Sequence, residues 1–228
     1  MFRKDPAFAG NKLTYAIYVG MYIFVFFLPG RLMSDRTAYL WAELIAYALL
    51  GIGGIFLCLD VFKEGFGQWK SHPAKNALWL VGAFLVDRLL ETLASLPLFL
   101  LAPDYESQNG ITLYVIMEKV PFPIFLLALG ILGPITEEVI YRSLLVRKAG
   151  SRMPVALCII ASSLLFMLGH MRSLSAEELL ANLPLFTTGL VYAIVLIKSK
   201  NITVPIFLHI FHNASALLLM YFMAYTNI

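Results

Sequence analysis

Charged residues and cysteines are scarce in this 228-residue chain. Only 14% of the residues are charged, against about 25% in an average soluble domain, whereas 60% are hydrophobic. The net charge of +3 gives no indication of a nucleic-acid partner. The two cysteines, Cys58 and Cys158, lie apart in apolar stretches, which excludes a disulfide framework. This composition predicts an integral membrane protein that works within the lipid bilayer and binds no nucleic acid.

The apolar runs predict an all-α, polytopic helix bundle. Residues 1–11 lack the pattern of a cleavable signal peptide, and no internal repeat or low-complexity segment is visible. At about 20 residues per span, we expect one membrane domain, 1–228, with three N-terminal spans within 1–101. A polar loop at 103–110 and a short interfacial helix at 111–119 separate these spans from the rest. The predicted spans are 13–32, 38–62, 77–101, 121–146, 154–170, 183–197 and 202–225.

The placement of lysine and arginine predicts the orientation of the bundle. Segments on the N-terminal side of the membrane hold eleven of these residues and segments on the other side hold four, so the positive-inside rule predicts a cytoplasmic N-terminus. The eleven are Arg3, Lys4, Lys12, Lys63, Lys70, Lys75, Arg147, Lys148, Arg152, Lys198 and Lys200, and the four are Arg31, Arg36, Lys119 and Arg172.

The fourth span carries two adjacent glutamates and an arginine, Glu137-Glu138-x-x-x-Arg142. A charge at the bilayer centre costs roughly 2.5–3.5 kcal/mol or more, so such groups are candidates for function. On a helix Glu138 and Arg142 share a face and can neutralise each other, whereas Glu137 points about 100° away. Glu137 is therefore the candidate general base. The structural alternative is that both glutamates brace the bundle by ion pairing.

Two further motifs follow, Phe166-x-x-x-His170 and His209-x-x-x-Asn213. His209 and Asn213 project from one face of a helix, where two donors could stabilise a developing oxyanion. The structural alternatives are an interfacial histidine at 170 and helix–helix hydrogen bonding by His209 and Asn213. His212 could share the face of His209, but it has no partner of similar chemistry one turn away.

A second polar group lies in the third span, where Arg88 can meet both Asp87 and Glu91. We favour a buried bracing network over a role in the path of substrate or water. Glu43 lies nearer a span end and suggests no special role.

In this order, the three motifs resemble the signature of the CAAX protease and bacteriocin-processing family of intramembrane endopeptidases. The resemblance covers residues 108–228 and implies hydrolysis of a peptide bond in a membrane-associated or short peptide precursor. It implies that Glu137 is the general base on a water that His170 orients. It also implies that His209 and Asn213 form the oxyanion hole, with Glu138, Arg142 and Phe166 as supporting residues. A chain this compact is most similar to bacterial members linked to bacteriocin maturation, immunity or peptide signalling, so we expect a bacterial plasma membrane.

We expect no cofactor, although Glu137, His170 and His209 could ligate zinc in an open three-ligand site. The spacing His-Glu-x-x-His is absent, and the sequence offers neither histidine a carboxylate partner of the kind that orients metal-bound histidines. Besides the zinc-dependent protease, the alternatives are a catalytically idle scaffold or bacteriocin-immunity protein and, less favoured, a transporter.

The predicted spans leave one geometric conflict. At 1.5 Å per residue, His170 lies roughly 24 Å from the inner end of its span and His209 about 10 Å from the inner end of its own. Both can meet Glu137 only if some spans tilt or shift.

Overall fold

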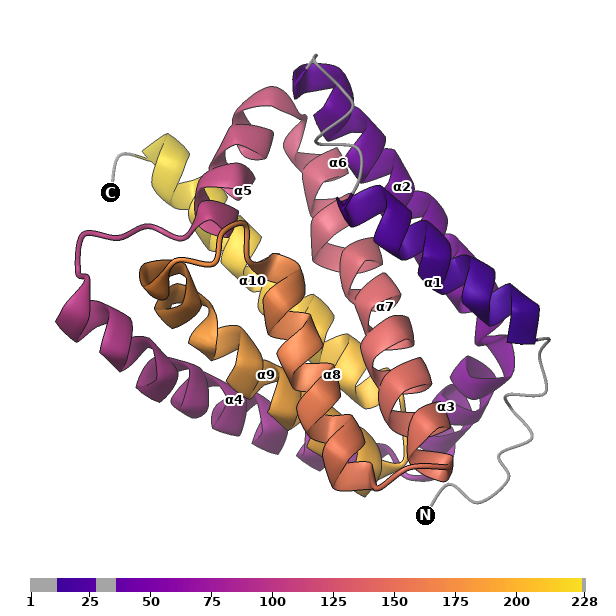
Figure 1. The fold of residues 1–228 in the computed structure, drawn as a ribbon. Coiled ribbons are helices and arrows are strands. Elements are labelled where there is room, and N and C mark those ends of the chain that lie inside the picture. The colour runs from indigo at the N-terminus through magenta and orange to yellow at the C-terminus, as the bar shows by residue number, and fades with distance from the viewer. Residues whose placement is uncertain (1–11, 28–35, 227–228) are drawn as a thin grey trace.

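The computed structural model describes residues 12–27 and 36–226, and within these ranges it contains helices and short connections but no β-strand. The predicted all-α fold is therefore confirmed (Figure 1). In chain order the elements are α1 (Lys12–Phe27), α2 (Arg36–Leu57), α3 (Leu59–Ser71), α4 (Pro73–Leu101), α5 (Gln108–Lys119), α6 (Phe122–Phe125), η3 (Leu126–Leu132), α7 (Gly133–Glu137), η4 (Glu138–Lys148), η5 (Ala149–Ser151), α8 (Val155–His170), α9 (Ala176–Ser199) and α10 (Thr203–Thr226).

Among the described residues, four helical segments are long and apolar enough to cross a membrane, namely Ala38–Leu57, Phe122–Lys148, Ala176–Ser199 and Thr203–Tyr225. Two shorter apolar helices, Leu13–Val25 and Val155–His170, accompany them. The 29-residue α4 carries Asp87, Arg88 and Glu91 but exposes many large apolar side chains, as a helix facing lipid does. The chain is thus an integral membrane helix bundle, while the number of seven spans stays a prediction.

The segments α6, η3, α7 and η4 form one long helix, called here the central helix. Its sections η3 and η4 have wider π-helical turns, a feature often found at functional sites. Pro134, which has no backbone N–H to donate, lies at the start of the short α-helical section between them. Most side chains of η4 are buried, and its charged residues Glu138, Arg142 and Arg147 therefore lie inside the bundle.

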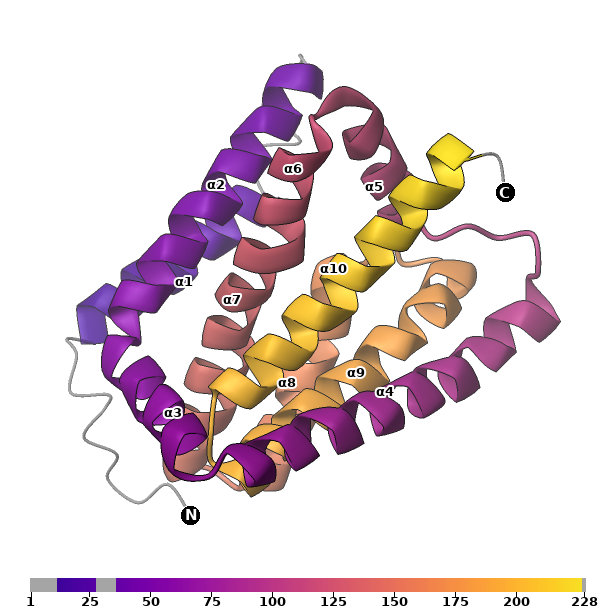
Figure 2. The same cartoon turned by 180° about the vertical axis from the view of Figure 1, so that it is seen from behind.

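The central helix lies between two groups of helices (Figures 1 and 2). Helices α1 and α2 cover one side, while α8, α9 and α4 lie on the other, and α10 crosses between them. Helices α8 and α9 approach closely because Gly189 has no Cβ; one built there would lie 2.8 Å from Ser163 Cα. This arrangement brings α8 and α10 to the middle of the central helix.

Several predicted boundaries differ from those of the structure. The predicted span 38–62 ends at Leu57, and α3 begins after a break at Cys58. Helix α9 begins at Ala176, before the predicted 183, because the Ser175 side chain accepts a hydrogen bond from the Glu178 backbone N–H. Ser107 caps α5 in the same way, so α5 includes the end of the predicted loop 103–110. Polar capping residues extend both helices beyond their apolar cores.

Candidate active site

The central helix positions the two glutamates at the junction of α7 and η4, where Glu137 ends α7 and Glu138 begins η4. Arg142 Nε lies 3.2 Å from Glu138 Oε2, and neither side chain is exposed to solvent. The predicted pairing of Glu138 with Arg142 is thus present, and Glu137 has no arginine or lysine in an ion pair with it among the residues described.

Arg142 is enclosed by aromatic rings. Its guanidinium carbon lies 4.6 Å from the ring centre of Phe166, 5.4 Å from that of Tyr192 and 5.8 Å from that of Tyr141. No guanidinium nitrogen makes a well-aligned hydrogen bond within the described parts of the chain, so the contact with Glu138 is an ion pair of poor hydrogen-bond geometry. The positive charge is therefore balanced by one carboxylate and by the faces of the rings.

Two histidines from different helices approach Glu137. His209 Nε2, from α10, lies 3.5 Å from Glu137 Oε2, and His170 Nε2, at the end of α8, lies 3.9 Å from Glu137 Oε1. Both distances exceed that of a direct hydrogen bond. The structure thus resolves the geometric conflict of the predicted spans, because α10 is inclined to the central helix and contacts its sections α7 and η3 (Figure 2).

The other nitrogen of each ring determines its tautomer. His209 Nδ1 lies 3.0 Å from Glu138 Oε1, and His170 Nδ1 lies 2.8 Å from the backbone oxygen of Phe166. A carboxylate and a carbonyl oxygen only accept hydrogen bonds, so both Nδ1 atoms carry the hydrogen. In the neutral rings, each Nε2 therefore presents a lone pair toward Glu137.

One argument from the sequence is thereby wrong for His209. We expected no carboxylate partner for either histidine, yet Glu138 accepts from His209, and the Phe166 carbonyl orients His170. Glu138 and His209 are 71 positions apart and meet only because α10 crosses the central helix at this point. Carboxylate and carbonyl partners are those that usually orient metal-bound histidines.

Asn213 lies one helical turn after His209 and is also held in place. Its Nδ2 donates to the backbone oxygen of Leu129, in the π-helical η3, over 3.3 Å. An asparagine amide has two N–H groups, so one of them is left for another acceptor.

These side chains line a cavity of about 210 Å³. Its lining includes all four predicted catalytic residues, Glu137, His170, His209 and Asn213, together with Phe166. Glu138 and Arg142 lie behind the lining, as supporting residues would.

Sequence reasoning missed part of this lining. Arg172 and Glu43 face the cavity, and Arg172 Nη2 lies 3.9 Å from Glu43 Oε1. Glu43, which suggested no special role, is buried. A glutamate inside an apolar stretch is itself a sign of function. Glu43 lies far from the three motifs in the sequence, so its place in the same cavity was not predicted.

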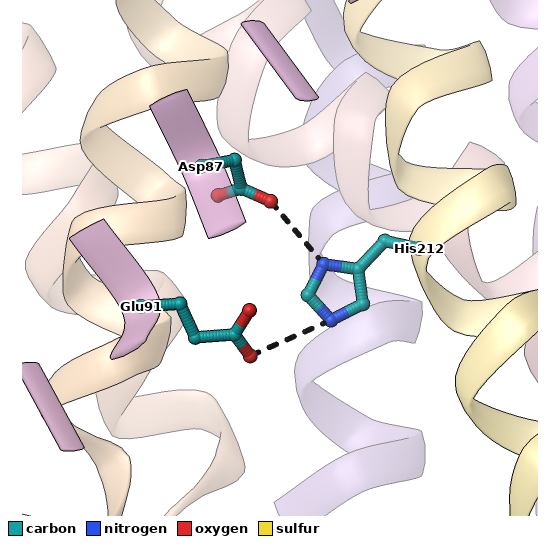
Figure 3. Close-up of side chains that lie close together, drawn as sticks. All are labelled: Asp87, Glu91 and His212. Atoms are coloured by element: carbon teal, nitrogen blue, oxygen red, sulfur yellow. Dashed lines mark hydrogen bonds and ion pairs between the residues drawn. The ribbon is translucent and has the colours of Figure 1, made fainter. Parts of the chain in front are cut away.

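The polar group of α4 makes the predicted ion pairs of Arg88, and its two acids also face His212 of α10 (Figure 3), while a bracing role stays a prediction. Arg88 contacts Asp87 (Nη2 to Oδ2, 2.7 Å) and Glu91 (Nη1 to Oε2, 2.5 Å). His212 Nδ1 lies 3.3 Å from Asp87 Oδ2, and His212 Nε2 lies 3.8 Å from Glu91 Oε1. His212 thus finds on α4 the partners that its own helix lacks, and it also lines the cavity.

Comparisons with known proteins agree with the motifs. The family model described as Type II CAAX prenyl endopeptidase Rce1-like matches residues 119–215, which include all three motifs. The Bacillus subtilis (strain 168) protein named "Putative membrane peptidase YdiL" is 26% identical over 146 residues, which are 63% of this chain and 56% of that protein. The alignment thus spans little more than half of the curated relative. No solved structure matches the chain.

Proposed function

We propose that this chain is an intramembrane endopeptidase, on the basis of its motifs and of the matched family model and relative. Its substrate would be a membrane-associated or short peptide precursor. The observation that supports this best is the convergence of Glu137, His170, His209 and Asn213 on one cavity from three separate helices. The peptidase names of the matched family and relative agree with it.

In the proposed reaction Glu137 is the general base. It takes a proton from a water molecule, whose oxygen attacks the peptide carbonyl carbon, and it then gives that proton to the leaving amine. His170 presents its Nε2 lone pair toward Glu137 and is suited to accept a hydrogen bond from the same water. The Phe166 carbonyl holds the ring in the tautomer that this task requires.

The free N–H of Asn213 and the Nε2 of His209 are the candidate oxyanion donors. His209 already donates from Nδ1 to Glu138, so it can donate from Nε2 only when its ring carries a second proton. The Glu138 carboxylate is then the counter-ion of the imidazolium, and Arg142 remains paired with its second oxygen. The Glu138 carboxylate is thus placed to accept from His209 Nδ1 whenever the ring carries that second proton.

Zinc-dependent hydrolysis is the second candidate, and the tautomers favour it. Two Nε2 lone pairs and one carboxylate make a His₂Glu donor set, in which a zinc ion would activate the attacking water. The distances between the candidate ligand atoms favour the metal-free reaction. In a tetrahedral zinc site with bonds of ~2.0 Å, the ligand atoms lie about 3.3 Å from one another. Among the described residues, the set whose ligand atoms all lie within 4.8 Å of one another is Asp87, Glu91 and His212. Glu137, His170 and His209 do not form such a set.

Cleavage by the purified protein tests the proposal. Protein in liposomes is incubated with an internally quenched peptide library, and the variants Glu137→Gln and Glu118→Gln are compared with the wild type. Glu118 is an exposed acid of α5 and serves as the matched control. We expect Glu137→Gln to abolish cleavage at unchanged thermal stability and Glu118→Gln to cleave normally.

Two other outcomes would count against the proposal. Turnover by Glu137→Gln near the wild-type rate would remove Glu137 from its role as base. Wild-type protein that binds peptides without cleaving any would favour the alternative of an idle scaffold or immunity protein. We further propose that the protein resides in a bacterial plasma membrane with a cytoplasmic N-terminus, as the charge distribution predicts.

A further inference from the structure

One turn of α10 carries two proposed oxyanion donors and, between them, a third polar side chain. His209 contacts Glu138, and Asn213 donates to the Leu129 backbone oxygen, so both are attached to the central helix. His212 contacts α4 instead. The turn is therefore fixed from two sides, by the central helix and by α4.

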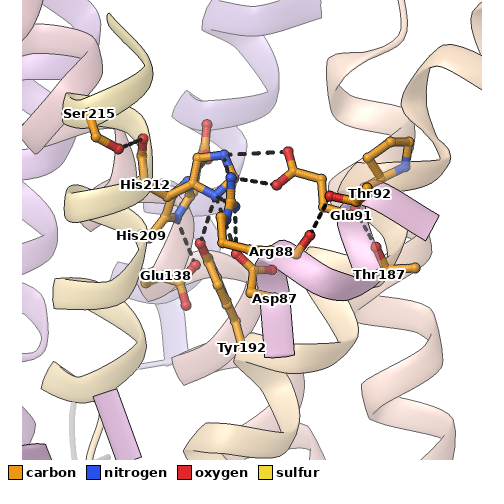
Figure 4. Close-up of polar contacts among 12 residues, drawn as sticks. Asp87, Arg88, Glu91, Thr92, Glu138, Thr187, Tyr192, His209, His212 and Ser215 are labelled. Carbon is orange, nitrogen blue, oxygen red and sulfur yellow. Dashed lines mark hydrogen bonds and ion pairs between the residues drawn. The ribbon is translucent and has the colours of Figure 1, made fainter. Parts of the chain in front are cut away.

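The contact with α4 is made by charged side chains, of which Asp87 is buried (Figure 4). The Asp87 side chain has no exposed surface, and its Oδ2 faces both His212 Nδ1, at 3.3 Å, and the Arg88 guanidinium. Arg88 Nη2 also contacts His212 Nδ1 directly. The neutral ring can either donate to Asp87 or accept from Arg88, and in both tautomers it stays attached to α4.

Two neighbouring groups connect this contact with the proposed active site. Tyr192, fully buried on α9, has its hydroxyl 3.4 Å from His212 Nδ1 and its ring centre 5.3 Å from that of His209. Phe84 of α4 packs edge-on against Phe211 of α10 at 5.1 Å. A shift of α10 relative to α4 would therefore move the His209 ring.

The same three side chains, Asp87, Glu91 and His212, could present metal ligands within 4.8 Å of one another. The Arg88 guanidinium contacts all three and supplies the positive charge that a divalent cation would bring. The cluster is thus already compensated by a residue of its own helix, which favours a positioning role over a metal site.

We propose that the contact of Asp87 and Arg88 with His212 is a positioning device that sets the rotation and depth of the α10 turn, and so the placement of His209 and Asn213. This inference rests on the proposed function, because it assigns these donors a catalytic task. It extends the site beyond residues 119–215, the region matched by the family model, since α4 precedes that region.

Kinetics of four variants test the proposal on a peptide that the wild type cleaves. Asp87→Asn removes the buried charge from a side chain outside the cavity lining, and His212→Leu removes the contact at similar volume. A misplacement of about 1 Å can cost about 10²-fold in rate, so we expect both to lower kcat by that order at nearly unchanged KM. His212→Asn offers both a donor and an acceptor and should restore most of the rate. Thr92→Val, on the exposed side of α4, should match the wild type.

A higher KM at wild-type kcat in the His212 variants would mean that His212 contacts substrate, and it would overturn the proposal. So would equal losses in His212→Asn and His212→Leu. Hydrogen exchange gives a readout independent of activity: Asp87→Asn should speed exchange about tenfold in α10 around residues 209–213, with α8 unchanged. If the wild type cleaves no peptide, the proposed function fails, and hydrogen exchange alone then tests whether Asp87 positions α10. Unchanged exchange in α10 would overturn the positioning role.

Discussion

Replacing Glu138 by glutamine tests the role of the Glu138–Arg142 ion pair independently of Glu137, the proposed base. Glu138 accepts from His209 Nδ1 over 3.0 Å and lies 3.2 Å from Arg142 Nε, and neither Glu138 nor Arg142 is exposed. Glutamine preserves the size of the side chain and one acceptor oxygen for His209. It removes the negative charge, and Arg142 is then left among three aromatic rings.

The magnitude follows from the burial of the pair. Removing one partner of a buried ion pair costs about 3–5 kcal/mol because the other charge is left uncompensated. The amide oxygen can still accept one hydrogen bond, worth about 1 kcal/mol. The net loss of about 2–4 kcal/mol should lower the melting temperature by about 5–15 °C for a chain of this size.

The protein contains its own probes for this measurement. Cys58 and Cys158 are free and buried, with 1% and 5% of their surface exposed, so a fluorogenic thiol reagent reports their exposure during heating in detergent. Glu137→Gln is the matched control, because Glu137 has no arginine partner to strand. Adding Arg142→Met to Glu138→Gln should recover much of the loss, because apolar residues often replace buried ion pairs at no cost. Equal melting temperatures for Glu138→Gln and Glu137→Gln would refute this account of Arg142.

Two further predictions concern topology and metal dependence. In sealed right-side-out vesicles, an impermeant thiol reagent should label a cysteine introduced at Gln108 but not one at Lys148 or Lys198; labelling at Lys148 would reverse the orientation. Purified enzyme should hold substoichiometric zinc and keep its activity in EDTA and phenanthroline, and His209→Ala and Asn213→Ala should each lower kcat by about 10²–10³, the usual loss for one oxyanion donor. Activity lost to chelators and restored by zinc, with the bound ion lost in His170→Ala or His209→Ala, would establish the metalloprotease instead.

The sequence predicts those features that depend on local pattern. Apolar runs of about 20 residues placed α8, α10 and the central helix within a few residues of their bounds, since lipid selects for length and hydrophobicity. The helical repeat alone placed Glu138 beside Arg142 and separated Glu137 from it. The four predicted catalytic residues do line one cavity, although their catalytic roles stay predictions.

The features that the sequence did not reveal depend on how helices cross. His209 meets Glu138, His212 meets Asp87, and Asn213 meets the Leu129 carbonyl, each across more than 70 positions of chain. Such pairs depend on the close packing of α10 against its neighbours, which no periodicity records. The break at Cys58 has no proline or charge beside it that would predict it from the sequence.

The charge of the site shows what the two candidate mechanisms share. With neutral histidines, Glu137, Glu138 and Arg142 leave one uncompensated negative charge in a buried site, which is costly in a low-dielectric interior. Glu138 already has Arg142, so the compensation must reach Glu137, either as a proton on Glu137 or His209 or as a divalent cation between the three donors. In the metal-free reaction that proton charges His209 toward the oxyanion, while a separate proton passes from the attacking water through Glu137 to the leaving amine. In the zinc-dependent alternative, an ion held by Glu137, His170 and His209 would supply this compensation and act as a Lewis acid. Glu137→Gln removes the carboxylate that both mechanisms need, so it should abolish activity in either case. Chelation distinguishes the mechanisms, because it should stop only the zinc-dependent one.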